Sequence, residues 1–182
     1  AVLAAHGVFQ VLCAVRRGPW GVAGLNQRIE AALAAEGLIP SMREWYAGRP
    51  VLVTRNDYGL GLMNGDIGIT LALPAGGDAE DAVLRVAFPA GDGNGGIKWV
   101  LPSRLLAVDT VFALTVHKSQ GSEFEHAAMF LPDTPNPILT RELLYTGVTR
   151  ARQWFTLVNP GGDTVERMAV ERRVLRTSGL MS

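Results

Sequence analysis

A polar turn that follows a short apolar stretch is the part of this sequence best suited to chemistry. Residues 112–116 predict a strand, and the turn after them reads His117, Lys118, Ser119, Gln120 and Gly121. In a parallel sheet, ligands bind beyond the carboxyl ends of the strands, and a glycine there lets a phosphate or ribose approach the backbone. Glu123, just after the turn, can accept hydrogen bonds from ribose hydroxyls.

The same turn also suits the phosphate backbone of a nucleic acid. The side chains of Thr115, His117 and Ser119 can donate hydrogen bonds to DNA phosphates, and Lys118 can pair with them as a point charge. Taken alone, a His-Lys-Ser-Gln-Gly turn is only a weak indication of either ligand.

Two arginines are a second candidate for phosphate chemistry. Arg150 and Arg152 end a helix that we expect over residues 140–151, and their spacing directs them to different faces. An isolated arginine at this place is explained by its interaction with the carboxyl end of the helix dipole. An inward-facing arginine beside a γ-phosphate instead stabilises the charge of phosphoryl transfer, and typically contributes about 10³- to 10⁵-fold in rate.

Further candidate ligand-binding residues lie in two other turns. Arg16 and Arg17 follow the apolar residues 8–15 directly, so either one of them reaches the same phosphate or both are ordinary loop residues. Asn64 opens the Asn-Gly-Asp-Ile-Gly sequence of residues 64–68, which is typical of a tight turn.

The elements that position the first of these candidates alternate between strand and helix. Residues 8–15 are a nearly continuous apolar run, typical of a strand buried in a parallel sheet, and residues 24–36 follow with helical spacing. Later in the chain the pattern predicts two strands and two helices, over residues 127–131, 155–158, 140–151 and 163–176. This alternation predicts an α/β fold with a mainly parallel sheet.

The middle of the chain has a different pattern. Short alternating stretches separated by turn residues predict strands over residues 50–54, 67–73, 83–88 and 98–101, with a Gly/Asp-rich loop over 75–81. We expect a small antiparallel β-barrel over residues 50–106, inserted into an α/β unit formed by residues 1–49 and 107–182. Tyr58 and Trp99 in this barrel either stack on nucleic-acid bases or serve as packing residues.

Composition and charge agree with this division. The 182 residues are 48% hydrophobic and 19% charged, and the net charge is zero, which argues against a uniformly basic surface. Residues 16–55 carry six basic and three acidic side chains, residues 57–92 carry six acidic side chains and one basic, and residues 141–176 carry seven basic and four acidic. We therefore expect any nucleic-acid contact mainly from the flanks.

Several features bear on the compartment of the protein. The single cysteine, Cys13, lies in an apolar run, so we expect it to be buried, and it allows no internal disulfide, which fits a reducing compartment. No apolar run reaches the roughly 18 residues of a membrane span, and the first residues lack a signal-peptide pattern.

The chain opens at Ala1 without Met, so we expect a piece of a longer protein.

Two segments resemble motifs V and VI of superfamily-one helicases, in the form found in the RecD family, the α subunit of bacterial exodeoxyribonuclease V (RecBCD). They are Thr-Val-His-Lys-Ser-Gln-Gly-Ser-Glu-Phe at residues 115–124 and Leu-Tyr-Thr-Gly-Val-Thr-Arg-Ala-Arg at residues 144–152. Residues 12–30 and 51–69 support the same family, so the resemblance covers most of residues 8–160.

The resemblance implies an ATP-driven helicase that moves 5′ to 3′ on single-stranded DNA and serves double-strand-break repair and recombination. It implies a RecA-like second motor lobe with an inserted SH3-like barrel, and ATP and Mg²⁺ as cofactors of the whole protein. It also implies RecB- and RecC-like subunits as partners, no membrane, and a place in the bacterial cytoplasm at the nucleoid.

The resemblance also implies roles for single residues. Motif VI makes Arg150 the arginine finger, and motif IV makes Arg16, in preference to Arg17, a second phosphate contact. Motif V places three residues at the nucleotide, namely Gln120, Gly121 and Glu123. The residues implied at the DNA are Thr115, His117, Lys118 and Ser119, together with the turn at Asn64.

The chain departs from this family because it lacks the motifs of the first motor lobe, which carries the phosphate-binding loop. It contains no Gly-x-x-x-x-Gly-Lys-Ser/Thr sequence and no paired acidic residues after a strand to hold Mg²⁺. We therefore expect it to supply one face of an ATP site, to hold no metal or cofactor tightly and not to hydrolyse ATP alone. Two alternatives remain open: a motor lobe of another superfamily-one helicase, such as a conjugative relaxase, and a non-catalytic DNA-binding module.

Overall fold

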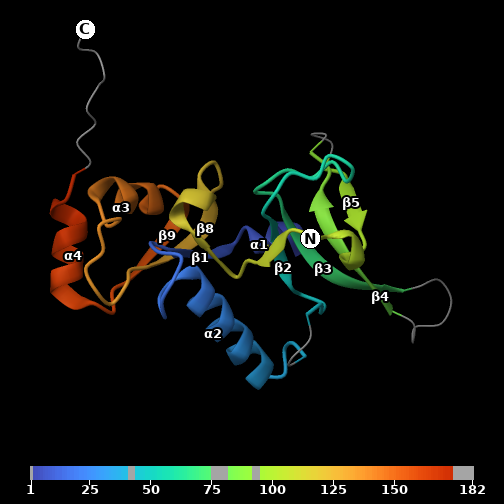
Figure 1. The fold of residues 1–182 in the computed structure, drawn as a ribbon, viewed down its shortest axis with the longest axis horizontal. Coiled ribbons are helices and arrows are strands. Elements are labelled where there is room, and N and C mark those ends of the chain that lie inside the picture. The colour runs from blue at the N-terminus through green and yellow to red at the C-terminus, as the bar shows by residue number, and fades with distance from the viewer. Residues whose placement is uncertain (1, 41–43, 75–81, 92–94, 174–182) are drawn as a thin grey trace, which may run out of the picture. The chain divides into compact units, whose positions relative to one another are not determined.

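The computed structural model of this chain describes residues 2–40, 44–74, 82–91 and 95–173 (Figure 1). The chain divides into two compact units. The parallel unit comprises Val8–Leu25 and Ala113–Ser182, and the antiparallel unit comprises Ala1–Gly7 and Asn26–Phe112. The loop expected over residues 75–81 and the end of the expected terminal helix lie outside the described residues.

The parallel unit is built on a four-stranded sheet in the order β7-β1-β8-β9, with every neighbouring pair parallel. Its strands are β1 (Phe9–Cys13), β7 (Ala113–Thr115), β8 (Phe124–Phe130) and β9 (Ala151–Val158). Leu12 of β1 pairs with Leu114 on one side and Met129 on the other, and all three are buried. This interior position explains the continuous apolar run that predicted the strand.

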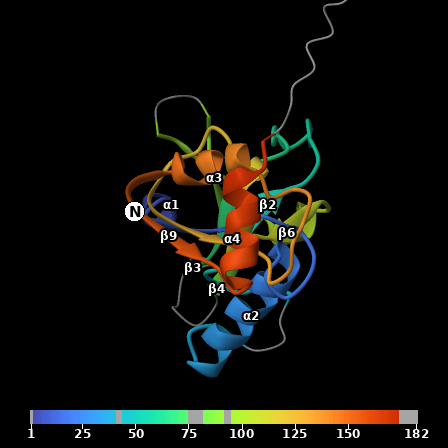
Figure 2. The same ribbon diagram turned by 90° about the vertical axis from the view of Figure 1, so that its left-hand side faces the viewer.

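Helices α3 (Arg141–Val148) and α4 (Gly162–Glu171) pack against each other, and α3 also lies against β8 and β9 (Figures 1 and 2). The side chain of Thr140 caps α3 by accepting a hydrogen bond from the Leu143 N–H at 3.2 Å. Near the other end, a Cβ added to Gly147 would stand 2.5 Å from Met129 Sδ, so glycine allows this close packing. The predicted helix over residues 140–151 is too long at its carboxyl end, because α3 ends at Val148.

Helix α2 (Val22–Ala35) starts in the parallel unit and continues in the antiparallel unit. Before it, the Trp20 ring stacks on Phe130 with ring centroids 6.1 Å apart, which fixes the loop that leaves β1. A Cβ on Gly24 would stand 2.5 Å from the Gly18 carbonyl oxygen, so the first turn of α2 approaches this loop at a distance only glycine permits.

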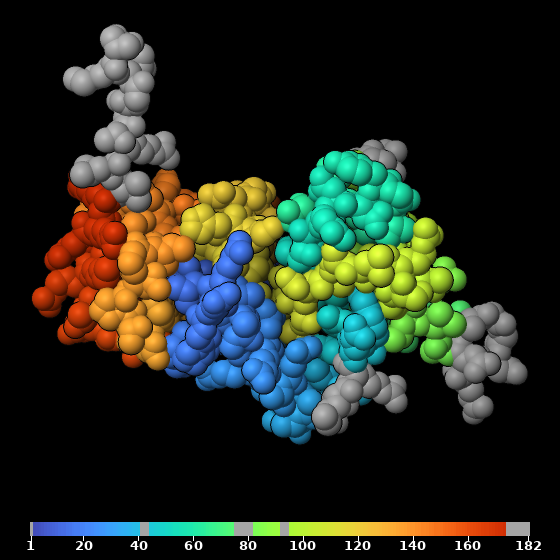
Figure 3. Space-filling view, viewed as in Figure 1, coloured from blue at the N-terminus to red at the C-terminus, as the bar shows by residue number. Residues whose placement is uncertain are grey.

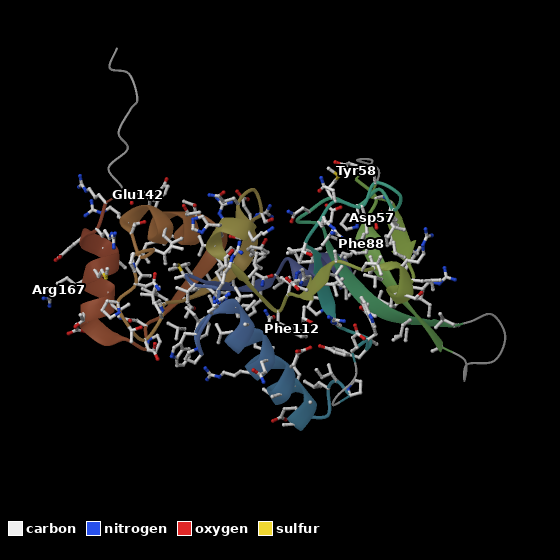
Figure 4. The ribbon with its side chains drawn as sticks, viewed as in Figure 1. Asp57, Tyr58, Phe88, Phe112, Glu142 and Arg167 are labelled. Atoms are coloured by element: carbon white, nitrogen blue, oxygen red, sulfur yellow. The ribbon has the colours of Figure 1, made fainter. Side chains whose placement is uncertain are left out.

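The antiparallel unit contains a five-stranded antiparallel sheet in the order β5-β4-β3-β2-β6. Its elements are α1 (Val2–His6), β2 (Pro50–Val53), β3 (Ile67–Pro74), β4 (Ala82–Pro89), β5 (Ile97–Val100), η1 (Pro102–Arg104) and β6 (Val108–Thr110). The buried core gathers on Phe88, which Figure 4 shows inside this unit, together with Val51, Val86 and Leu62. An α/β fold with one parallel and one antiparallel sheet is confirmed, whereas α1 and β6 were not predicted.

Two glycines of the predicted Asn64–Gly68 turn have different reasons to be glycine. Gly65 has a φ of 104° and takes the backbone conformation that the turn needs. Gly68 lies in β3, where a Cβ would stand 2.6 Å from Phe88 Cε1 and 2.7 Å from Val86 Cγ1. Only Gly65 therefore follows the turn chemistry that the sequence indicated.

We expect Gly68→Ala to lower the free energy of unfolding by about 1–3 kcal/mol, because the added methyl overpacks the core around Phe88. Gly59→Ala is the matched control, since its Cβ would have its nearest neighbour 3.5 Å away at Asp57 Oδ1. Urea unfolding of the two variants measures the difference. Equal midpoints for both would contradict the packing described for Gly68.

The thiol of Cys13 is fully buried at the end of β1, and burial raises its pKa to about 12. We expect a thiol reagent at pH 8 to leave the native protein unmodified and to react completely once urea unfolds it. Because the pKa is higher in the folded than in the unfolded state, stability is retained below the ordinary thiol pKa and falls as pH rises toward 12. Fast labelling of the native protein would show that β1 is not buried.

Candidate nucleotide and nucleic-acid site

The turn after β7 is a short 3₁₀ helix, η2 (Val116–Ser119), and two of the predicted ligand residues build it. The Thr115 hydroxyl accepts a hydrogen bond from the Lys118 N–H at 3.2 Å, and the Ser119 hydroxyl donates one to the Val116 carbonyl at 2.7 Å. Both residues are buried, with Thr115 7% and Ser119 0% exposed. These hydroxyls therefore stabilise the turn, and their contact with DNA stays a prediction.

The other residues of the turn are open to solvent. His117, Lys118 and Gln120 are exposed, and Gln120 ends the 3₁₀ helix. Gly121 has a φ of 86°, and no atom lies within 4 Å of the place where a Cβ would stand. A ligand can therefore reach the backbone at Gly121 without displacing a neighbour.

Arg150 is held against the segment that follows this turn. Its guanidinium donates from Nη1 to the Ser122 carbonyl at 3.0 Å, from Nε to the Thr146 carbonyl at 3.2 Å and from Nη2 to the Thr149 hydroxyl at 3.3 Å. The Arg150 carbonyl also accepts the Phe124 N–H at 2.8 Å, so backbone and side chain are both anchored. Partly buried and fixed in this way, the cation is preorganised at the edge of the sheet.

Arg152 reaches the same segment from strand β9. Its Nε lies 3.0 Å from Glu123 Oε2, and its Nη1 lies 3.7 Å from Glu125 Oε1. Both pairs are solvent-exposed, so each contributes at most about 1 kcal/mol. Arg150 and Arg152 thus have different surroundings, but not for the helical reason that their spacing suggested, because α3 ends at Val148 and Arg152 lies in β9. The carboxylate expected at a ribose is paired with Arg152.

A groove of about 370 Å³ lies beside the exposed part of the turn. One wall is made by His117 and Gln120, and the other is made by the approach to α3 and its first turns, namely Pro137, Ile138, Thr140, Glu142, Leu143 and Thr146. Figure 3 shows the atoms of these two segments, yellow and orange, next to each other, in agreement with the contact between η2 and α3. The sequence predicts a helix that starts at Thr140, but it gives no sign that this end of the helix forms the second wall of a groove.

Arg16 is not brought to Arg150 by the sheet register. Arg16 leaves the carboxyl end of β1, where Cys13 pairs with Phe130, whereas the Arg150 carbonyl bonds to Phe124 at the start of β8. Six residues of β8 separate these two levels, which is about 20 Å along the strands at roughly 3.3 Å per residue. The two arginines therefore leave opposite ends of the parallel sheet.

Asn64 belongs to the other compact unit and has its own local network. Its N–H donates to Asn56 Oδ1 at 2.8 Å, and the Asn56 amide donates to the Tyr58 hydroxyl at 3.2 Å. Tyr58 is 80% exposed and stands at the rim of the unit in Figure 4, while Trp99 is partly exposed on β5. These residues form a separate surface of the antiparallel unit.

The described part of the chain shows neither a metal site nor a membrane span. No group of His, Cys, Asp and Glu residues there has the arrangement that holds a metal ion. No helix in the same residues is long and apolar enough to cross a membrane.

Comparisons with known proteins agree with the motifs. Residues 110–158 match the model of the UvrD-like helicase C-terminal domain. RecBCD enzyme subunit RecD of Mycobacterium tuberculosis is 45% identical over 94% of this chain and 28% of its own length, and that of Haemophilus influenzae is 39% identical over 93% and 24%. The ATP-dependent RecD2 DNA helicase of Deinococcus radiodurans is 36% identical over 98% of this chain and 24% of its own length.

Solved structures support the fold. A Pif1 helicase from Bacteroides, in complex with ADP-AlF3 and ssDNA, superposes with a TM-score of 0.51 at 19% identity, covering 83% of this chain and 40% of the other. Pif1 helicase from Candida albicans gives a TM-score of 0.51 at 15% identity, covering 84% and 45%. The chain spans about a quarter of the length of the curated relatives it matches, and over these residues it belongs to the RecD family.

Proposed function

We propose that this chain is the second motor lobe of an ATP-dependent 5′–3′ DNA helicase of the RecD type. In this proposal the parallel unit is the RecA-like lobe, and residues 50–106 are its inserted SH3-like barrel. The observation that carries the proposal is the anchoring of Arg150 on the Ser122 carbonyl, which joins motif VI to motif V at one place. The whole protein would act with RecB- and RecC-like subunits in double-strand-break repair, in the bacterial cytoplasm at the nucleoid.

The residues present fit one face of an ATP site. Arg150 supplies a fixed cation for the γ-phosphate, and Gly121 leaves its backbone open to a ligand. Glu123 would accept the ribose hydroxyls after leaving Arg152, and Gln120 lies next to Gly121 in the same loop. When bound, MgATP supplies the phosphoryl group whose transfer drives movement.

The other face of the site must come from elsewhere, because the sequence has no phosphate-binding loop. We therefore propose that the 182 residues alone do not hydrolyse ATP. Since Arg16 leaves the opposite end of the sheet, the proposal gives the γ-phosphate to Arg150 and keeps Arg16 as a candidate for a different phosphate.

The DNA contacts proposed for the parallel unit are His117 and Lys118, which are exposed on η2. Thr115 and Ser119 support them by holding the turn, through the hydrogen bonds that their hydroxyls make with it. Asn64 is proposed as a separate contact on the antiparallel unit.

The match to a RecD2 DNA helicase favours a second candidate, a helicase that works without RecB- and RecC-like subunits. Purification of the natural full-length protein distinguishes the two, because RecB- and RecC-like chains accompany it only in the first case.

We expect Arg150→Ala, in a helicase that carries this lobe with its phosphate-binding lobe, to lower the rate of ATP hydrolysis by about 10³- to 10⁵-fold. ATP binding should change little, because the missing guanidinium acts mainly on the charge of the transition state. Arg167→Ala, which removes an exposed arginine from α4, is the control and should keep the rate within tenfold (Figure 4). Rapid hydrolysis by the Arg150 variant would remove this residue from the site.

Binding of this chain to single-stranded DNA across a salt series tests the contact from η2. Each neutralised phosphate contributes about −0.7 to the slope of log K against log salt on a single strand, so Lys118→Ala should flatten the slope by about 0.7. Arg167→Ala removes the same charge from α4 and should leave the slope unchanged. The contact is ruled out if the two variants have the same slope.

A further inference from the structure

The groove between η2 and α3 has two walls of different chemistry. The wall from the approach to α3 presents Pro137 and Ile138, and Ile138 is 39% exposed although it is a large apolar side chain. The wall from η2 is formed by His117, which carries an imidazole, and Gln120, which carries an amide. A volume of about 370 Å³ lies within the range of pockets that hold a small ligand.

The apolar wall is fixed by the local backbone. The Ile138 N–H donates to Asn136 Oδ1 at 3.0 Å, and the Leu139 N–H donates to the Asn136 carbonyl at 3.0 Å. Thr140 then caps α3, and Leu139 is fully buried beneath the wall. Ile138 is therefore held at the groove by a constrained turn rather than by a mobile loop.

The residues that line the groove select against a phosphate. None of them is lysine or arginine, and Glu142 brings a carboxylate. A flat, uncharged group suits them better: the apolar wall and the imidazole can cover its faces, and Gln120 can hydrogen-bond to its edge. A nucleobase has this chemistry, whereas its phosphate needs a cation outside the groove.

Lys118 provides such a cation next to the groove. Lys118 follows His117 directly, is exposed and does not line the groove. We infer that the groove takes one unstacked base of single-stranded DNA, with a neighbouring phosphate at Lys118. This inference rests on the proposed function and specifies which part of the DNA the turn recognises.

A free nucleotide carries the same base chemistry, but single-stranded DNA fits the surroundings better. A nucleotide carries its phosphates only on the 5′ side of its ribose, so Lys118 can meet them from one direction only, and the groove lining adds no second cation for a polyphosphate. In a DNA strand the phosphates lie on both sides of each sugar, so one of them can reach Lys118 while the base stays in the groove.

The test compares binding of two labelled eight-unit oligomers to the 182-residue chain: oligothymidylate, and a sugar-phosphate oligomer of the same charge without bases. Stacking contributes about 1–3 kcal/mol per base, so wild type should prefer oligothymidylate by about 5- to 150-fold. Ile138→Ala should reduce this preference at least threefold, whereas Lys118→Ala should weaken both oligomers alike. Val148→Ala is the matched control, because Val148 is an exposed apolar residue of α3 outside the groove.

The outcomes separate this inference from the proposed function. If neither oligomer binds, the proposed DNA-binding role fails. If both bind but Ile138→Ala leaves the base preference of wild type intact, while Cys13 stays protected as in the folded protein, the groove is not a base pocket. If ADP displaces oligothymidylate from wild type but not from Ile138→Ala, the groove holds the base of a nucleotide and the assignment to DNA is overturned.

Discussion

The tight return from β7 to β8 is the constraint on which the candidate site depends. Both strands run parallel to β1 and flank it, so the chain must travel back along the sheet between Thr115 and Phe124. Thr115 and Phe130 both pair with Cys13, so this return covers about 20 Å along the strands. A parallel crossover usually takes a dozen residues or more, and here only residues 116–123 are available.

This short connection leaves no room for a full helix, and the polar turn takes the form of a capped 3₁₀ helix followed by an exposed glycine. The backbone path of this connection is set by the distance between β7 and β8, by the Thr115 cap and by the hydrogen bond of the Ser119 hydroxyl. The Ser122 carbonyl therefore stands at a fixed place when Arg150 reaches it. The connection itself thus provides the preorganisation that an electrostatic site needs.

The sequence predicts most of the fold because each element carries its own pattern. The unbroken apolar run of β1 indicates a central parallel strand, and the alternation in β3 and β4 indicates an antiparallel sheet. The position of Arg16 relative to Arg150 could not be predicted in this way. Both follow an element at a turn, but only the register shows that they leave opposite ends of the sheet.

The roles of hydroxyl residues are also hidden in a single sequence. A threonine or serine in a polar turn has the same chemistry whether it binds a ligand or its own backbone, and local backbone bonds are common for both residues. The hydroxyls of Thr115 and Ser119 hydrogen-bond to the backbone of the turn, whereas His117 and Lys118 are exposed. The backbone role of these two hydroxyls is visible only in the structure, and their contact with DNA stays a prediction.

Helix α3 connects the two parts of the site through a single residue. Thr146 lines the groove, and its carbonyl accepts a hydrogen bond from Nε of Arg150, one turn later. Gly147, between them, is pressed against Met129 of β8, so this turn of the helix cannot slide freely along the sheet. The groove and the anchor of Arg150 therefore share one turn of α3, and a change in the position of this turn would alter both.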